Sequence, residues 1–405
     1  MNDLVPIRRL HELQVIIKVA ERCNLACSYC YYFFMGDDSY KKRDPIMKCD
    51  KFVLVADYLK NGVRDLGIQD VKIVFHGGEP TLMRPRDFRL LVSALSDALA
   101  PICRVSFGIQ TNGYHLSREL EDILSDFGIT VGVSLDGPEQ YNDRFRLTHR
   151  GKGSHKKVTK TIYRLHELER ERRINTIGVL SVIERETPIE ETFNHFVDDL
   201  EFGYMGFLLP DRSHDHPFAE GESAAQYGDM LIALFNKWLD RQDVSVREVA
   251  KVISYFQRYI PSQVEPADIF DKRTHVVVIQ STGEVSCDDS LIPALEWRLS
   301  QRAYSIVNSS LLDFVNDPGL LTLDEARLRL PDDCAGCQWR KICGGGALEN
   351  RFSRARQFDN SSIYCEGLKK YYAYIANYLI HNGYPHSLMQ KILDIEGSAN
   401  PTVAI

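Results

Sequence analysis

The stretch Val15–Cys30, VIIKVAERCNLACSYC, carries three cysteines directly after a strand-like run. Val15–Val19 is rich in β-branched residues, which is typical of a buried strand. Cys23, Cys27 and Cys30 follow with the spacing C-x3-C-x2-C. Thiolates are the usual ligands of iron–sulfur clusters, and a structural cluster takes four of them. Three leave one iron open, which is typical of a catalytic metal site, so the pattern predicts a cluster that also binds a small chelating ligand.

Other uses of these cysteines agree less well with the pattern. Zinc motifs usually supply paired C-x2-C halves near each other. A disulfide framework requires an even number of cysteines and an oxidising compartment. Residues Met1–Leu10 are polar and lack the apolar region of a signal peptide, and no apolar stretch is long enough to span a bilayer. We therefore expect a cytoplasmic protein with no membrane partner.

The composition is that of a globular protein. The chain has 405 residues, of which 44% are hydrophobic, and its formal net charge is -7. A protein that binds nucleic-acid phosphates is usually basic, so no nucleic-acid partner is expected. Eight of the ten cysteines lie in two parts of the chain, three over residues 23–30 and five over residues 287–365, which indicates metal binding. The other two, Cys49 and Cys103, are expected to be small buried hydrophobes.

Strand-like and helix-like segments alternate along the first two hundred residues. This alternation implies βαβ units and a parallel sheet, and six units with right-handed crossovers make an open, partial barrel. In such sheets the chemistry gathers at the carboxyl ends of the strands. The expected strands are Val15–Val19, Val71–Phe75, Val105–Ile109, Thr130–Leu135, Thr176–Val182 and Tyr204–Leu208, and the expected helices are Lys51–Asp65, Arg86–Ala100, Ser117–Phe127, Lys156–Glu169 and Pro188–Asp199.

Polar and glycine-rich residues follow several of these strands. The run His76–Pro80, HGGEP, has two glycines that let the backbone approach a ligand, and Glu79 can accept a hydrogen bond from an ammonium group. The glycine pair alone could also be an ordinary turn. Asn112 and Asp136 are either cofactor contacts or plain turn residues. The run Asn142–Arg146 is expected in a loop that is either solvated or directed at substrate.

A second cysteine group lies near the end of the chain. Cys334-x2-Cys337-x5-Cys343 followed by Cys365 gives four thiols, enough to enclose one cluster, and Gly344–Gly346 lets the chain bend tightly around it. A structural zinc site on the same four cysteines is the alternative. We expect metal, rather than a core, to set the order of residues 332–366.

The region between the two cysteine groups is expected to hold helices and a hairpin. A polar loop over residues 211–222 precedes helices over 224–240 and 246–259, and strands over 275–280 and 284–287 form the hairpin. A helix over 368–379 closes the fold, and the tail after Gly397 is expected to fray. Asp288 and Asp289 follow the hairpin and are either solvated turn residues or acid–base groups.

These motifs together resemble the radical SAM superfamily, in which a cluster of this kind cleaves S-adenosylmethionine. The second cysteine group resembles the SPASM extension of peptide-modifying members. The resemblance implies an α/β fold, a partial (β/α)6 radical SAM barrel with a C-terminal Cys-rich SPASM-like domain. The expected domains are the barrel over residues 1–210, a helical bridging region over 211–270, the auxiliary iron–sulfur domain over 271–383 and a tail over 384–405.

Residue roles also follow from the resemblance. Cys287 fits one position of a second, inner auxiliary cluster, but the cysteine expected after the triple glycine is absent, since Ala347–Glu349 stands there. Asp288 and Asp289 are candidate acid–base residues. The cofactor contacts implied are Tyr29, His76, Gly77, Gly78, Glu79 and Ser134, the ligands of the first [4Fe–4S] cluster are Cys23, Cys27 and Cys30, and those of an auxiliary [4Fe–4S] cluster are Cys334, Cys337, Cys343 and Cys365.

Within the superfamily, the chain is similar to the FxsB/XyeB-like peptide maturases that form cyclophane crosslinks. Such an enzyme would use a 5′-deoxyadenosyl radical to abstract a Cβ hydrogen from a ribosomally made precursor peptide, after which the carbon radical attacks an aromatic ring. Flavodoxin or ferredoxin would supply the electron, and no peptide-recognition domain is expected before Gln14. The residues that carry this similarity include Cys30–Tyr32, Asp38–Tyr40, Arg43–Pro45, Phe207–Pro210, Asp289–Leu291 and Phe358–Asn360.

Other functions remain alternatives at this point. On the same fold, the alternatives are epimerisation, thioether or ether formation, and the oxidation of a sulfatase Ser or Cys. From a different class, the chain could be a non-catalytic iron–sulfur sensing protein. Cleavage of S-adenosylmethionine would distinguish an enzyme from a sensor.

Overall fold

The computed structural model describes residues 10–257 and 274–393. The described residues form two compact units. Unit 1 contains residues 10–180, 274–289 and 301–322, and unit 2 contains residues 181–257, 290–300 and 323–393. The four domain ranges expected from the sequence stay a prediction.

Unit 1 is built on a mostly parallel sheet with β1 near its middle. β2 pairs in parallel with one side of β1, and β3, β4 and β5 continue the sheet in that direction. β8 pairs in parallel with the other side of β1, followed by the antiparallel strands β9 and β10. These strands are β1 (Glu12–Ala20), β2 (Asp70–Gly77), β3 (Arg104–Thr111), β4 (Thr130–Ser134), β5 (Ile177–Val182), β8 (Thr274–Ile279), β9 (Glu284–Cys287) and β10 (Tyr304–Ser305).

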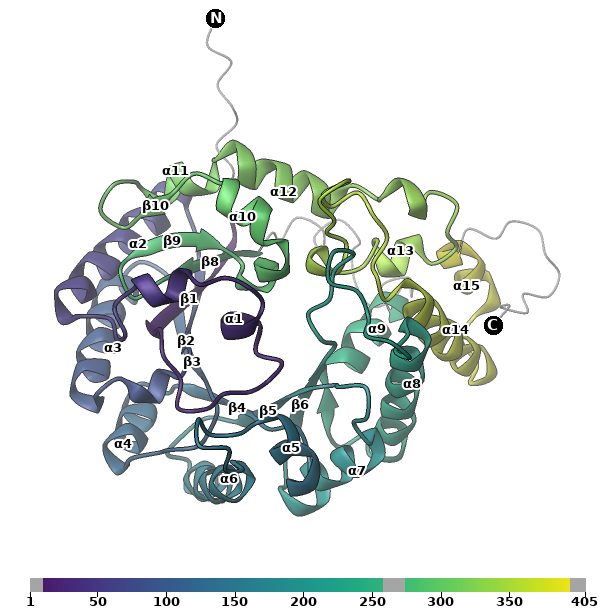
Figure 1. The fold of residues 1–405 in the computed structure, drawn as a ribbon, viewed down its shortest axis with the longest axis horizontal. Coiled ribbons are helices and arrows are strands. Elements are labelled where there is room, and N and C mark those ends of the chain that lie inside the picture. The colour runs from purple at the N-terminus through teal and green to yellow at the C-terminus, as the bar shows by residue number, and fades with distance from the viewer. Residues whose placement is uncertain (1–9, 258–273, 394–405) are drawn as a thin grey trace, which may run out of the picture. The chain divides into compact units, whose positions relative to one another are not determined.

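Helices cover the outside of this sheet, whereas the short helix α1 lies on its inner side (Figure 1). Successive residues of a strand point to opposite faces, so Ile17 and Lys18 of β1 face different surroundings. Ile17 is fully buried, and the Lys18 ammonium lies over the ring of Tyr32 in α1. The helices of unit 1 include α1 (Tyr31–Phe34), α2 (Phe52–Leu66), α3 (Pro85–Leu99), α4 (Arg118–Asp126), α5 (Glu139–Phe145), α6 (His155–Arg170) and α11 (Leu311–Val315).

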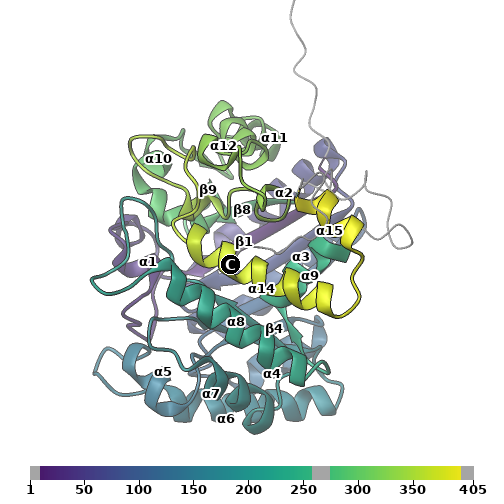
Figure 2. The ribbon, with the colours of Figure 1, turned by 90° about the vertical axis from the view of Figure 1, so that its right-hand side faces the viewer.

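Unit 2 is mainly helical. Its parallel strands β6 and β7 form one pair, and helices α8 and α14 lie side by side (Figure 2). Gly228 of α8 permits this approach, because a Cβ atom there would lie 2.6 Å from the Gly367 carbonyl oxygen of α14. The elements include β6 (Tyr204–Leu208), β7 (Ser245–Val246), α7 (Ile189–Asn194), α8 (Ala224–Asp240), α9 (Arg247–Gln257), α10 (Leu295–Ser300), α13 (Arg340–Cys343), α14 (Cys365–His381) and α15 (His386–Leu393), and α12 (Pro318–Leu328) has residues in both units.

The α/β architecture with a parallel-strand sheet is confirmed, but two local expectations were wrong. Asn142–Arg146 does not form a loop: most of it belongs to α5, and Asn142 is fully buried. Residues 332–366 contain apolar packing of their own, because Trp339, Phe352 and Phe358 are buried. Residues 258–259 and the tail after Gly397 lie outside the described residues. In the described part of the chain, every helix is too short or too polar to cross a membrane.

Candidate active site

The cysteine loop, residues 21–30, connects β1 to α1 and carries three half-buried thiols. Burial raises the pKa of Cys23, Cys27 and Cys30, that of Cys23 to about 12, and the charges of the other two thiols contribute to the rise at Cys23. Cys23 Sγ accepts hydrogen bonds from the backbone of Leu25 at 3.4 Å and from Asn112 Nδ2 at 3.5 Å. Thiols that raise one another's pKa are deprotonated together only when positive charge stabilises their thiolates. A metal cluster supplies that charge.

The two glycines at the end of β2, Gly77 and Gly78, lie against the cysteine loop. The backbone N–H groups of Gly78 and Glu79 donate to the carbonyl oxygens of Ala20 and Arg22 at 2.7 and 2.8 Å. A Cβ atom on Gly78 would lie 2.3 Å from the Arg22 oxygen, and one on Gly77, which has a φ of 147°, would lie 2.1 Å from the Ala20 oxygen. Only glycine therefore allows the backbone at the end of β2 to form these hydrogen bonds with the start of the cysteine loop.

The carboxylate of Glu79 is occupied by protein donors. It is 1% exposed and accepts hydrogen bonds from Thr81 N, Thr81 Oγ1, Thr111 Oγ1 and Asn112 N at 2.7–3.0 Å. Burial raises its pKa, and these donors act in the opposite direction. Glu79 thus fixes the ends of β2 and β3 against each other. Asn112, at the end of β3, also donates to Asn24 Oδ1 at 2.7 Å, so it is not a plain turn residue.

A buried ion pair lies on the inner side of the sheet. Lys18 Nζ lies 2.5 Å from Asp289 Oδ2 and 3.4 Å from His76 Nδ1, and the Tyr31 hydroxyl donates to Asp289 Oδ2 at 2.9 Å. Lys18 is 0% exposed and Asp289 is 7% exposed. Lys18 is paired with His76 in the register of β1 and β2, which places their side chains on the same face. The pair therefore joins β1 to the segment that follows β9.

The charges around the Lys18–Asp289 ion pair distinguish the two candidate acid–base residues. Burial acts to raise the pKa of Asp289, but the Lys18 ammonium, His76 and the hydrogen bonds from Lys18 and Tyr31 together hold the pKa well below its usual range. Burial, with a contribution from Lys18, lowers the pKa of His76 to about 4. The interpretation of Asp289 as a solvated turn carboxylate was wrong, because it is a buried anion that Lys18 neutralises. Asp288 is half-exposed beside it.

Tyr29 ties the cysteine loop to β4 and α5. Its hydroxyl donates to Asp136, just after β4, and accepts from Arg146 Nη1 at 2.8 Å. Arg146 is 6% exposed, and its Nε has no hydrogen-bond partner. Burial raises the pKa of Cys27, and the Arg146 guanidinium acts against that rise. Asp136 is likewise buried, so the plain-turn interpretation was wrong for it as well.

Ser134 and Gln110 form a further polar pair at the ends of β4 and β3. Gln110 Nε2 donates to Ser134 Oγ at 2.9 Å. Gly132 leaves room for the amide, since a Cβ atom there would lie 2.2 Å from Gln110 Oε1. Sequence reasoning missed Lys18, and it missed the contacts that Gln110 and Arg146 make. For Lys18 a signal existed, because a lysine inside an otherwise apolar parallel strand requires a buried partner.

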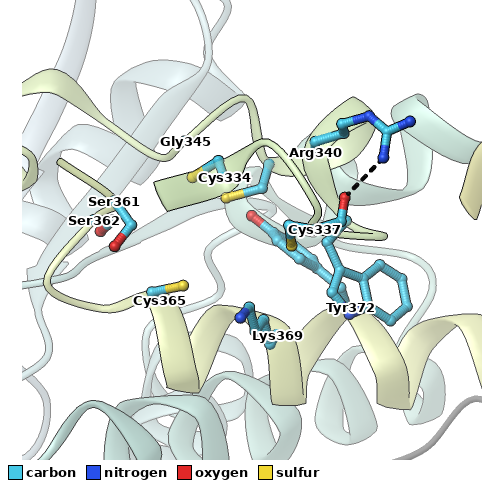
Figure 3. Close-up of a pocket in the computed structure, with 11 residues that line it drawn as sticks. Cys334, Cys337, Arg340, Gly345, Ser361, Ser362, Cys365, Lys369 and Tyr372 are labelled. Atoms are coloured by element: carbon cyan, nitrogen blue, oxygen red, sulfur yellow. Dashed lines mark hydrogen bonds between the residues drawn. The ribbon is translucent and has the colours of Figure 1, made fainter. Parts of the chain in front are cut away.

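The second cysteine group lines one cavity in unit 2. Cys334, Cys337, Cys343 and Cys365 surround an empty volume of about 320 Å³ that is partly open to solvent (Figure 3). Burial raises the pKa of Cys343 to about 11, and the charges of Cys365 and Cys334 contribute. Within the described residues, no three His, Cys, Asp or Glu side chains are arranged to hold a single metal ion. The four thiols instead face a shared space, as a multi-atom cluster requires.

The remaining cysteines differ from expectation in two cases. Cys49 is exposed at the start of a 3₁₀ turn and donates to Asp87 at 3.5 Å, and Cys103 is half-buried. The expectation of two buried hydrophobes was wrong, because Cys49 begins a 3₁₀ turn and Cys103 lies in the turn between α3 and β3, both outside the core. Cys287 is 8% exposed at the end of β9, and its role as a cluster ligand stays a prediction.

Comparison with known proteins agrees with this fold. The family model described as "Radical SAM superfamily" matches residues 17–196. The chain is 27% identical to the serine-type anaerobic sulfatase-maturating enzyme of Bacteroides thetaiotaomicron, over 94% of this chain and 95% of that protein. It is 24% identical to the cysteine-type enzyme of Clostridium novyi, over 90% and 95%. The structure described as native anSMEcpe with bound AdoMet and Cp18Cys peptide covers 92% of this chain and 98% of its own, with 21% identity and a TM-score of 0.74.

The parallel sheet, the cysteine loop and these matches define the class: the chain has the radical SAM fold and is a radical SAM oxidoreductase. Its cofactors are accordingly S-adenosylmethionine and [4Fe–4S] clusters. More particularly, it is similar to the anaerobic sulfatase-maturating enzymes over nearly its whole length.

The expected subfamily was wrong. The sequence motifs favoured an FxsB/XyeB-like maturase that forms cyclophane crosslinks in a ribosomal precursor peptide. The relatives include serine-type and cysteine-type sulfatase-maturating enzymes, which match one of the alternatives instead. The motifs misled because they are motifs expected to bind cofactors, and cofactor binding does not determine which bond of the substrate is made or broken.

Proposed function

We propose that the chain oxidises a serine or cysteine side chain of a peptide or protein substrate. The similarity to sulfatase-maturating enzymes carries the proposal, because it includes both serine-type and cysteine-type relatives and extends over nearly the full length of each. Removing one hydrogen atom from Cβ, one proton from the hydroxyl group and one electron converts a seryl CH₂OH group into an aldehyde. The same removal from a cysteinyl CH₂SH group gives a thioaldehyde, which water hydrolyses to the aldehyde with release of H₂S. The chemistry therefore requires a radical, a base and an electron acceptor.

The two cysteine groups fit the cofactors that this reaction needs. Cys23, Cys27 and Cys30 would hold the first cluster, and Tyr29, His76, Gly77, Gly78, Glu79 and Ser134 would surround S-adenosylmethionine. Bound together, this cluster and S-adenosylmethionine supply the radical that takes the Cβ hydrogen. The contacts described above suggest that Glu79 and Tyr29 act mainly by positioning the loop and the strand ends. Cys334, Cys337, Cys343 and Cys365 would hold an auxiliary cluster.

Asp288 is the better of the two candidates for the base. A general base must be able to take a proton, and its efficiency falls when its pKa lies far below the working pH. Asp289 is bound to Lys18 and Tyr31, and its pKa lies well below the usual range. Asp288 is half-exposed and directly follows Cys287. We assign the hydroxyl or thiol proton of the substrate to Asp288 and a positioning role to Asp289.

The reaction also requires two electron transfers, one from the substrate and one to the first cluster. After loss of the Cβ hydrogen and the proton, one electron remains to be removed from the substrate, and the cluster that Cys334, Cys337, Cys343 and Cys365 would hold would supply an acceptor for it. An external donor such as flavodoxin or ferredoxin would reduce the first cluster. In this proposal the partners are thus a peptide or protein substrate and a small electron carrier.

Three matched peptides test the proposal. The reconstituted full chain, S-adenosylmethionine and a reductant are incubated with a sulfatase-derived peptide that carries Ser, Cys or Ala at the target position. We expect an aldehyde, captured by a hydrazide probe and located by tandem mass spectrometry, from the Ser peptide, the Cys peptide or both. The Ala peptide and the Cys23→Ala, Cys27→Ala, Cys30→Ala variant should give none. Cleavage of S-adenosylmethionine without an aldehyde in any peptide would contradict the proposal.

A further inference from the structure

One face of α14 presents three side chains to the four-thiol cavity. Cys365, Lys369 and Tyr372 occupy positions i, i+4 and i+7, so they lie on the same side of the helix, and all three line the cavity (Figure 3). Lys369 emerges one turn after Cys365. Its positive charge is therefore placed at the wall of the same cavity that the Cys365 thiol lines.

Hydrogen-bond donors also reach the sulfur atoms. The Tyr372 hydroxyl, on a side chain that is 7% exposed, shares a hydrogen bond with the Cys343 thiol. Ser361 shares one with Cys365, and the backbone N–H of Gly345 donates to Cys343. Two of the four sulfur atoms are thus contacted by donors.

Positive charge and hydrogen bonds to sulfur stabilise the more negative state of a cluster. One-electron reduction adds a negative charge to a site that already holds four thiolates, and the potential of an iron–sulfur cluster depends on charge and on hydrogen bonds to its sulfurs. We propose that Lys369 and Tyr372 raise the reduction potential of the auxiliary [4Fe–4S] cluster, so that it can accept the electron that substrate oxidation releases. This inference rests on the proposed function.

Lys370 provides a matched control on the same helix. It follows Lys369 directly, but its ammonium lies 2.6 Å from Asp229 of α8, and it is not among the residues that line the cavity. Lys370→Met removes the same formal charge from the same stretch of helix. Any effect specific to the cluster should therefore appear with Lys369→Met and be absent with Lys370→Met.

The test is a redox titration of the auxiliary cluster alone. In the full-length chain with Cys23, Cys27 and Cys30 changed to Ala, the midpoint potential is followed by EPR, and iron content confirms loading. We expect Lys369→Met to lower the equilibrium constant for reduction about tenfold, which corresponds to about 59 mV for one electron. Tyr372→Phe should shift the potential in the same direction. Lys369→Arg should restore it, and Lys370→Met should leave it unchanged.

Two results would overturn the inference, and they are distinguishable from each other. If the parent chain loads no second cluster, both the four-thiol assignment and the tuning role fail. If the cluster is present but Lys369→Met and Tyr372→Phe leave its midpoint where it was, or Lys370→Met shifts it equally, only the tuning role fails. If the Lys369→Met variant does not load iron, the midpoint potential of the Tyr372→Phe variant decides whether the tuning role holds.

Discussion

Lys18 places a fully buried ammonium in a strand that is otherwise largely apolar. A charge is retained in such a place only when it is paired, because an unpaired ion loses its hydration without compensation. Asp289 supplies the partner at 2.5 Å, and Tyr31 occupies the same carboxylate oxygen. The pair fixes the segment after β9, which carries the candidate base Asp288, against the middle of the sheet.

Breaking this pair should be costly in stability. Lys18→Met leaves Asp289 buried and unpaired, and such losses cost about 3–5 kcal/mol. The double variant Lys18→Met, Asp289→Leu should recover most of that loss, since no buried charge remains. Urea unfolding of the reconstituted protein measures both. A double variant as unstable as Lys18→Met alone would contradict an ionic origin of the effect.

Substitutions of the two neighbouring aspartates should have different effects: that of Asp288 mainly on turnover, and that of Asp289 mainly on stability. Asp288→Asn should reduce kcat by about 10²–10⁴-fold, the range for loss of a general base, with both clusters still loaded. Asp289→Asn should lower the free energy of unfolding more than Asp288→Asn does, because it removes the charge that compensates Lys18. Turnover and urea titrations on the same preparations test this. Equal turnover for Asp288→Asn and the parent would remove Asp288 as the base.

Element by element, the hydrophobic pattern was a good guide to the sheet. The six runs rich in β-branched residues all coincide with strands, because parallel strands are buried on both faces and so give continuous apolar stretches. Boundaries near the cysteines were harder to predict. The last long helix begins at Cys365, not at Leu368, because cysteine and glycine carry no periodicity. The short helices α10, α11 and α12 were missed, since each is too brief or too weakly amphipathic to show a pattern.

In the candidate site, too, some features could be predicted from the sequence and others could not. The cysteines and the GGEP run were visible in the sequence because their spacing is local. The contacts that hold them were not: Arg146 with Tyr29, Asp289 with Lys18 and Asn112 with Cys23 join residues far apart in the chain. Such long-range polar pairs leave no periodic signal, so only the folded structure could identify them.

The junction between β2 and the cysteine loop leads to a prediction about glycine. Gly78→Ala would place a Cβ atom 2.3 Å from the Arg22 carbonyl oxygen, and neither backbone segment can yield without moving Cys23. We expect lower iron loading of the first cluster and loss of S-adenosylmethionine cleavage. Gly203→Ala is the matched control, because nothing lies within 4 Å of its added Cβ, and its effect on stability should stay within about 0.5 kcal/mol. Normal iron loading in Gly78→Ala would show that the close approach is not required.

At the scale of the whole molecule, each unit carries one cysteine group. Unit 1 places three thiols at the carboxyl end of its sheet, and unit 2 places four around a cavity. The class of enzyme was predictable from the sequence, because the cofactors impose fixed ligand spacings. The reaction was not, since substrate choice depends on side chains that line the sheet and on loops that carry no motif.

Transfer of deuterium from the substrate directly tests whether the enzyme oxidises a serine or cysteine side chain at Cβ. The full chain is given a peptide whose target serine or cysteine is deuterated at Cβ, and the mass of the 5′-deoxyadenosine formed is measured alongside the aldehyde product. We expect one deuterium in 5′-deoxyadenosine for each aldehyde formed, and none when the deuterium is placed at Cα. Unlabelled 5′-deoxyadenosine from the Cβ-deuterated peptide, or label only from Cα, would contradict oxidation at the side chain.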